Sequence, residues 1–194
     1  MRARISDGAA WVDTDLTGFV QYGGERVEFG PPAGGTVDEF FNFPTPANPD
    51  WADDPVNVGC VWATLTAGDW IGNRMWVAPS AGTVRTAAYN WDTQGVLIPS
   101  EVIGGGVGQY VSHLFASAVS VLPGVSYMAA MHTTRYGFTR PSEGAVTPFT
   151  TVQLYTSADM GAVSYYTYGP AGNLPTTSSP NFHFNVSPIV RFPA

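Results

Sequence analysis

Three consecutive segments decide the fold of this chain: Val56-Asn57-Val58-Gly59-Cys60-Val61-Trp62-Ala63-Thr64-Leu65, the turn Thr66-Ala67-Gly68-Asp69, and Trp70-Ile71-Gly72-Asn73-Arg74-Met75-Trp76-Val77. Both apolar stretches are rich in β-branched and aromatic residues, which favour strands. The segment between them contains Gly and Asp, which are typical turn residues. The sequence therefore predicts two consecutive strands, Val56–Leu65 and Trp70–Val77, and places Trp62 and Trp76 at mid-strand positions in the core.

The same pattern repeats along the rest of the chain, at intervals of about ten residues. Twenty-two Gly and 16 Pro residues interrupt it, and no window of about a dozen residues has an uninterrupted helical period. Further strands are expected at Val84–Trp91, Gly95–Val102, Gln109–Phe115, Val119–Val121, Ser126–Thr133, Phe149–Tyr155, Val163–Tyr166 and Pro188–Phe192. This spacing predicts an all-β fold, an antiparallel β-sandwich of jelly-roll-like type spanning residues 56–194.

Residues 1–30 are predicted to form a separate arm made of two small β-ribbons. The turn signals are Ser6-Asp7-Gly8 and Gly23-Gly24-Glu25. Two-stranded ribbons are marginal alone in water, so we expect this arm to be ordered by contact with a partner. The apolar side chains expected to serve this assembly role are Trp11, Phe19, Tyr22 and Phe29.

Residues 31–55 join the arm to the sandwich and are predicted to be a linker rich in Pro and Gly. Sequence of this composition is stiff and extended, with bends at the glycines. The linker also contains Phe40, Phe41 and Phe43, which we interpret as packing anchors.

The charge pattern excludes several classes of function. Hydrophobic residues make up 44% of the chain and charged residues only 12%, against ~25% in typical soluble proteins. The net charge is −7, and the eight basic residues are all Arg and scattered singly. Binding to nucleic acid needs clustered positive charge. We therefore expect no nucleic-acid partner and a surface that is partly covered in an assembly.

The N-terminus has no apolar segment of the kind found in signal peptides, because Met1-Arg2-Ala3-Arg4 leads directly into polar sequence. No stretch approaches the ~18–20 apolar residues of a membrane span. We expect a protein made in a cytoplasm, without membrane insertion.

The carboxylates and the histidines do not predict a catalytic site. The acidic candidates are Asp50, Asp53, Asp54, Asp69 and Asp92, all expected in turns, where Asp caps backbone groups. Calcium bound by Asp50, Asp53 and Asp54 is the one metal site considered, since Ca²⁺ takes oxygen ligands. No other cofactor is expected.

His113, His132 and His183 lack the spacing of metal ligands. Cys60 is expected to be a buried apolar residue, because the chain has no second cysteine with which it could form a disulfide. The segment Gly104–Gly108 is interpreted as a turn and not as a phosphate loop.

The aromatic residues are the remaining candidates for binding. Six lie near predicted loops or strand ends: Trp51, Trp91, Tyr136, Tyr165, Tyr166 and Tyr168. Aromatic rings offer flat apolar platforms that match the C–H faces of sugars. The residues favoured for contact with a glycan or a partner are Trp91, Tyr136, Tyr165, Tyr166 and Tyr168. The alternative is a partly buried rim or interface.

Several segments of the sandwich resemble a β-sandwich domain family of undescribed function, found in bacterial surface proteins and in minor tail proteins of actinobacterial phages. The resemblance covers about residues 56–137. Its segments are Val58–Trp62, Trp70–Trp76, Val84–Trp91 with Gly95–Ile98, and Val119–Leu122 with Pro123–Met128. The family implies no catalytic or ligand residues. In the arm, Ser6–Val12 is similar to a short ribbon of phage tail-tip and fibre proteins.

The composition and the resemblance together suggest a phage virion structural protein, either a minor tail protein or a surface decoration protein. Such a protein is expected in the virion, made in the host cytoplasm, and without enzymatic activity. Its expected partners are other virion proteins, further copies of itself in a trimer, and a host cell-surface glycan. The alternatives are a free-standing carbohydrate-binding or adhesion module, and a small enzyme that degrades glycans.

Overall fold

The computed structural model describes residues 3–6, 11–14, 19–22, 25–28, 36–140, 150–156, 163–180 and 182–193. These residues contain strands and no helix. Contacts divide the chain into a unit of residues 1–37 with 193–194, and a unit of residues 38–192. Over the described residues no helix is long and apolar enough to span a bilayer.

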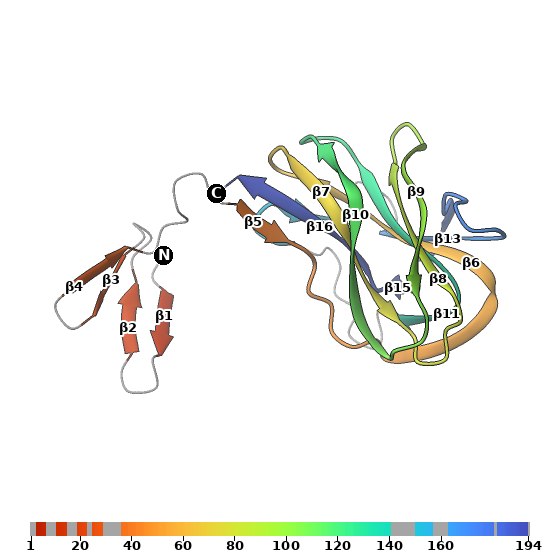
Figure 1. Cartoon of the computed structure of the whole chain (residues 1–194), viewed down its shortest axis with the longest axis horizontal. Helices are drawn as coiled ribbons and strands as arrows, with labels where there is room; N and C mark the ends of the chain where they lie inside the picture. The colour runs from red at the N-terminus through yellow and green to blue at the C-terminus, as the bar shows by residue number, and fades with distance from the viewer. Residues whose placement is uncertain are drawn as a thin grey trace. The chain divides into compact units, whose positions relative to one another are not determined.

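The first unit contains two antiparallel ribbons, as the turn signals predicted (Figure 1). One joins β1 (Ala3–Ser6) to β2 (Trp11–Thr14), and the other joins β3 (Phe19–Tyr22) to β4 (Glu25–Glu28). The proposed assembly residues Trp11, Phe19 and Tyr22 lie on these strands, but their side chains are outside the described part of the chain, and so is Phe29 as a whole.

The remaining strands build the sandwich. They are β5 (Thr36–Glu39), β6 (Asn48–Thr64), β7 (Gly68–Val77), β8 (Val84–Asn90), β9 (Gly95–Gly104), β10 (Gln109–Val121), β11 (Tyr127–Thr139), β12 (Leu154–Tyr155), β13 (Ser164–Tyr168), β14 (Thr177–Ser178), β15 (His183–Phe184) and β16 (Val186–Pro193).

The strands pair in a nested order that defines a jelly roll. The pairs are β5 with β16, β6 with β11, β7 with β10 and β8 with β9, so the chain behaves as a long hairpin rolled into two sheets. One sheet has the order β10-β7-β16-β5 and the other the order β14-β13-β6-β11-β8-β9 (Figure 1). The prediction of an antiparallel, jelly-roll-like sandwich is confirmed.

The core lies between the two sheets and is built around aromatic side chains. Trp62 of β6 and Trp70 of β7 are fully buried and meet edge to face, with ring centroids 4.9 Å apart. The ring of Tyr127 lies 5.1 Å from that of Trp62. Trp76 is also buried, so both mid-strand tryptophans singled out from the sequence are core residues.

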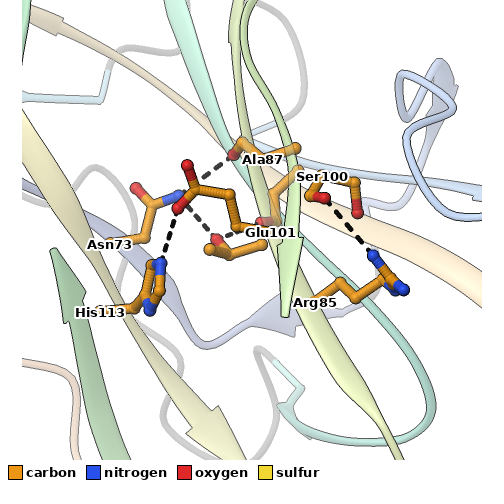
Figure 2. Close-up of polar contacts among 8 residues, drawn as sticks. Asn73, Arg85, Ala87, Ser100, Glu101 and His113 are labelled. Atoms are coloured by element: carbon orange, nitrogen blue, oxygen red, sulfur yellow. Dashed lines mark hydrogen bonds and ion pairs between the residues drawn. The ribbon is translucent and has the colours of Figure 1, made fainter. Parts of the chain in front are cut away.

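Polar contacts also join the two sheets (Figure 2). Buried Asn73 of β7 donates to Thr86 Oγ1 (2.9 Å) and to the Ala87 carbonyl (3.1 Å), both on β8. Between the edge strands of the two sheets, His113 Nε2 of β10 lies 2.7 Å from Glu101 Oε2 of β9. Every partner here comes from the opposite sheet, so these contacts fix the stacking of the sheets.

The first half of β6 differs from the sequence prediction. The strand begins at Asn48 and not at Val56, so residues 48–55 belong to the sandwich and not to a linker. Over this half β6 pairs with β11 on one side, and β13 joins it only from Val56 onward. Because no strand in the described part of the chain pairs with that edge before Val56, Pro49 and Pro55 can lie there without the loss of a ladder hydrogen bond.

Strands β10 and β11 are also longer than predicted. The segments expected as separate strands at 109–115 and 119–121 form one strand, β10, with a register shift between Leu114 and Val119. β11 continues to Thr139, six residues beyond its predicted end, and this extension contributes to the candidate site.

Candidate ligand-binding groove

Four segments of the chain, three of them within strands and the fourth leading into β15, contribute one pair of side chains each to a single groove. In every pair the two residues are two positions apart in the sequence. We call this site the aromatic groove, and its lining residues are Trp51 and Asp53, Tyr136 and Phe138, Tyr166 and Tyr168, and Phe182 and Phe184.

The spacing and the sheet order explain why these pairs converge. Alternate residues of a strand point to the same face of the sheet. The contributing segments are neighbours, because β13 pairs with β6, β6 with β11, and β11 with β15. Trp51 lies directly opposite Tyr136 in the ladder, and Phe138 directly opposite Phe184.

The floor of the groove is a packed aromatic cluster. Tyr136, Phe138 and Phe184 are buried. The rings of Tyr136 and Phe184 lie 5.5 Å apart and edge to face, and those of Phe138 and Phe182 lie 4.7 Å apart. Such edge contacts add about 0.5–1.5 kcal/mol per pair beyond burial, so the floor is preorganised.

The rim of the groove carries two exposed aromatic rings. Trp51 is 48% exposed and Tyr168 is 52% exposed. Trp51 is supported edge to face by Phe138 at 5.6 Å, and Tyr168 by Tyr166 at 5.7 Å. Rings that are held at one edge and open on a face are suited to stacking against a ligand.

Asp53 supplies the one charged group of the lining. Its Oδ2 accepts hydrogen bonds from the hydroxyls of Tyr136 (2.9 Å) and Tyr168 (3.1 Å), and its Oδ1 accepts one from the Asp54 amide (2.9 Å). Burial, followed by the hydrogen bond and charge of Asp53, raises the pKa of Tyr136, and the same causes raise the pKa of Tyr168. Both hydroxyls are therefore protonated donors at neutral pH.

The groove has a volume of about 300 Å³, at the lower end of the range of small-molecule sites. It combines stacking surfaces with a carboxylate and phenol hydroxyls. That set can bind a small ring that has one apolar face and polar groups around its edge.

The structure separates the aromatic residues chosen from the sequence into two groups. Tyr136, Tyr166 and Tyr168 line the groove, together with Trp51. Tyr165 and Trp91 lie elsewhere, with ring centroids 4.5 Å apart, in a cluster that includes Tyr89. Tyr165 is on the opposite face of β13 from its neighbours because strand side chains alternate.

Sequence reasoning missed Phe138, Phe182 and Phe184. The missed signal is the recurrence of aromatic residues two positions apart, as in Tyr136/Phe138 and Phe182/Phe184, which matches the pair Tyr166/Tyr168. Strand β15 supplies Phe184 but has only two residues, too few for the pattern to predict a strand.

The calcium site considered at Asp50, Asp53 and Asp54 is not formed. These residues lie on strand β6 and not in a turn, so alternation prevents their side chains from converging. Asp50 forms an ion pair with Arg135 at 3.2 Å. Burial alone would raise the pKa of Asp50, but hydrogen bonds from Ser80 and Arg135 outweigh it and lower the pKa. No cluster of three or more metal-ligating side chains occurs within the described ranges.

Neither a reactive thiol nor a pair of carboxylates occurs among the described residues that line the groove. Cys60 is buried, and burial raises the pKa of its thiol to about 12, which keeps it protonated. Glycosidases of the usual kind need two carboxyl groups flanking the scissile bond. Among the described residues that line the groove, Asp53 alone is acidic.

Comparison of the chain with protein-family models and with curated protein sequences finds no match.

Proposed function

We propose that this protein binds an oligosaccharide in the aromatic groove and does not act on it chemically. The observation that supports this proposal is the pairing of open rings, Trp51 and Tyr168, with hydrogen-bonding groups at Asp53 and Tyr136. Stacking on rings and bonding at a polar edge are the contacts that a sugar ring needs.

The proposed setting is the surface of a phage particle, as a minor tail or decoration protein that contacts the host cell surface. Its support comes from the resemblance of residues 56–137 and from the low charge content of 12%. Jelly rolls serve both as capsid domains and as lectin domains, which agrees with a structural protein that also binds glycans. A free-standing carbohydrate-binding module is the second candidate, supported by the same groove.

A non-catalytic role is favoured by the state of Asp53. Its Oδ2 atom already accepts hydrogen bonds from two tyrosine hydroxyls, and among the residues that the structure describes no second carboxylate lines the groove. Asp53 is therefore placed to orient a ligand, and an acid/base pair across a glycosidic bond is not supplied by the lining residues.

A glycan array followed by calorimetry tests the proposal. Trp51→Ala and Tyr168→Ala are each expected to lower the affinity for the tightest-binding glycan by about tenfold, because each removes a stacking face. Trp91→Ala is the matched control, since Trp91 packs against Tyr165 outside the groove and should leave affinity within about twofold. Equal losses in all three variants, or no glycan bound by the wild-type protein, would contradict the proposal.

A further inference from the structure

Asp53 has no cationic partner among the residues that the structure describes. Its hydrogen-bond donors are the hydroxyls of Tyr136 and Tyr168 and the amide of Asp54, all of them neutral. The nearby guanidinium of Arg135 is paired with Asp50 at 3.2 Å. A carboxylate offers about four acceptor positions, so at least one position of Asp53 is open to a ligand.

The two ends of the aromatic lining differ in whether a cation lies over their rings. At one end, the guanidinium of Arg140 lies over the rings of Phe138 (5.2 Å) and Phe182 (5.7 Å). In the described part of the chain, no cation lies over the rings of the lining residues Trp51, Tyr136, Tyr166 or Tyr168. The end of the groove next to Asp53 therefore has electron-rich ring faces that carry no counter-charge.

Aromatic faces combined with a carboxylate form a site for an organic cation. The ring quadrupole attracts ammonium groups within about 6 Å of the centroid, most strongly at Trp. A partly desolvated carboxylate adds a charge-assisted hydrogen bond, which is stronger than a neutral one. The net charge of −7 favours the approach of a cation over that of an anion.

We propose that the aromatic groove selects a ligand that carries an organic ammonium group, with Asp53 binding the charge and Trp51 and Tyr168 enclosing it. This inference rests on the proposed function and narrows it to cationic glycans. The ammonium has two chemical sources, the free amine of an amino sugar and a choline substituent on a surface polymer. Both present a positive nitrogen beside apolar C–H groups.

The test compares two oligosaccharides that share a backbone and differ in the nitrogen substituent of each sugar. Chitosan tetrasaccharide carries free amines and chitin tetrasaccharide carries neutral acetamides on the same backbone. Calorimetry in mildly acidic, low-salt buffer is expected to show chitosan binding at least about tenfold more tightly. Phosphocholine is titrated in parallel, to distinguish the choline source from the amino-sugar source.

Two variants and a competitor locate the charge recognition. Asp53→Asn is expected to remove the preference for the ammonium ligand, with a loss of about tenfold. Asp54→Asn removes the same charge from the next, exposed position of β6 and should retain the preference. Tetramethylammonium chloride should displace the ligand from the wild-type protein more effectively than sodium chloride at equal ionic strength, which tests the idea without any substitution.

The outcomes separate this inference from the proposed function. Phosphocholine binding that depends on Asp53, without chitosan binding, supports the inference and identifies choline as the source. If chitin binds as tightly as chitosan and Asp53→Asn changes neither affinity, the ammonium inference is overturned while the groove remains a glycan site. Failure of all three probes to bind overturns the inference, and an empty glycan array in addition overturns the proposed function.

Discussion

His183 is the residue whose protonation is most incompatible with the fold. It is buried on β15 with its ring 4.5 Å from that of Phe43, and burial lowers its pKa from 6.5 to about 3. Below pH 6.5 the unfolded chain therefore binds a proton that the folded chain excludes. The free energy of unfolding should fall as the pH drops from 6.5 toward 3, by about 2 kcal/mol at pH 5 from this group alone.

Urea unfolding at neutral pH and at pH 5 measures this effect. His183→Gln should be less stable than the wild type at neutral pH but should lose about 2 kcal/mol less on acidification, because no imidazole remains to be protonated there. An unchanged slope in His183→Gln would contradict the assignment.

At the scale of single residues, the sequence identified most of the groove's polar and exposed aromatic side chains but not the phenylalanines of its floor. Tyr136, Tyr166, Tyr168 and Asp53 were all named, although Asp53 was given a metal-binding role. Strand alternation separates Tyr165 from Tyr166, but it does not indicate which face carries the groove. That choice depends on which strands are neighbours, which is a property of the whole sheet.

At the scale of elements, β7 and β10 lie side by side (Figure 1), and their backbones leave no space for a side chain at Gly72. A Cβ at this position would lie 2.2 Å from the backbone carbonyl oxygen of His113. Gly72→Ala should therefore destabilise the sandwich by about 1–3 kcal/mol, because backbone must move to relieve the overlap. Chemical denaturation gives the value.

Gly82→Ala is the matched control for this prediction. A Cβ at Gly82 would have no heavy atom within 4 Å, so the change in stability should be within about 0.5 kcal/mol. If both substitutions cost the same, the strands are not held in register as closely as the backbone contact requires.

The elements that sequence reasoning misplaced are those whose pairing is asymmetric. Residues 48–55 contain two prolines, which normally argue against a strand, yet here they occupy the part of β6 that is paired on one side. The edge position that permits them arises from where β13 ends, more than a hundred residues later. Turn residues predicted the hairpins well because a hairpin is local in sequence.

At the scale of the whole molecule, the spacing of strands predicts a sandwich, but the order of strands within each sheet does not follow from spacing. The nested pairs join strands as distant as β5 and β16, and only packing of the complete chain selects them. The aromatic groove is a product of this nesting, since its four contributing segments lie between residues 51 and 184.

The arm is the part of the molecule that the sandwich does not need for its own pairing. Deletion of residues 1–30 removes both ribbons and leaves β5, which is held to β16 partly by the two-bonded ion pair of Asp38 with Arg191 at 2.8 and 2.9 Å. We therefore expect the truncated protein to keep a β-sheet circular dichroism spectrum and the unfolding midpoint of the full chain. Light scattering should show a trimer for the full chain and a monomer for the truncated one, because isolated ribbons gain stability from partners.

The other results of that measurement each point to a different arrangement. If the truncated protein remains a trimer, the contacts between copies lie in the sandwich, and the assembly role of the arm is contradicted. If the full chain and the truncated protein are both monomers, either the arm pairs with a different protein of the proposed virion or the chain is a free-standing glycan-binding module. Mixing each protein with purified particles that lack it then decides between these two. If the arm is an assembly device, the full chain should be incorporated into the particles and the truncated protein should not.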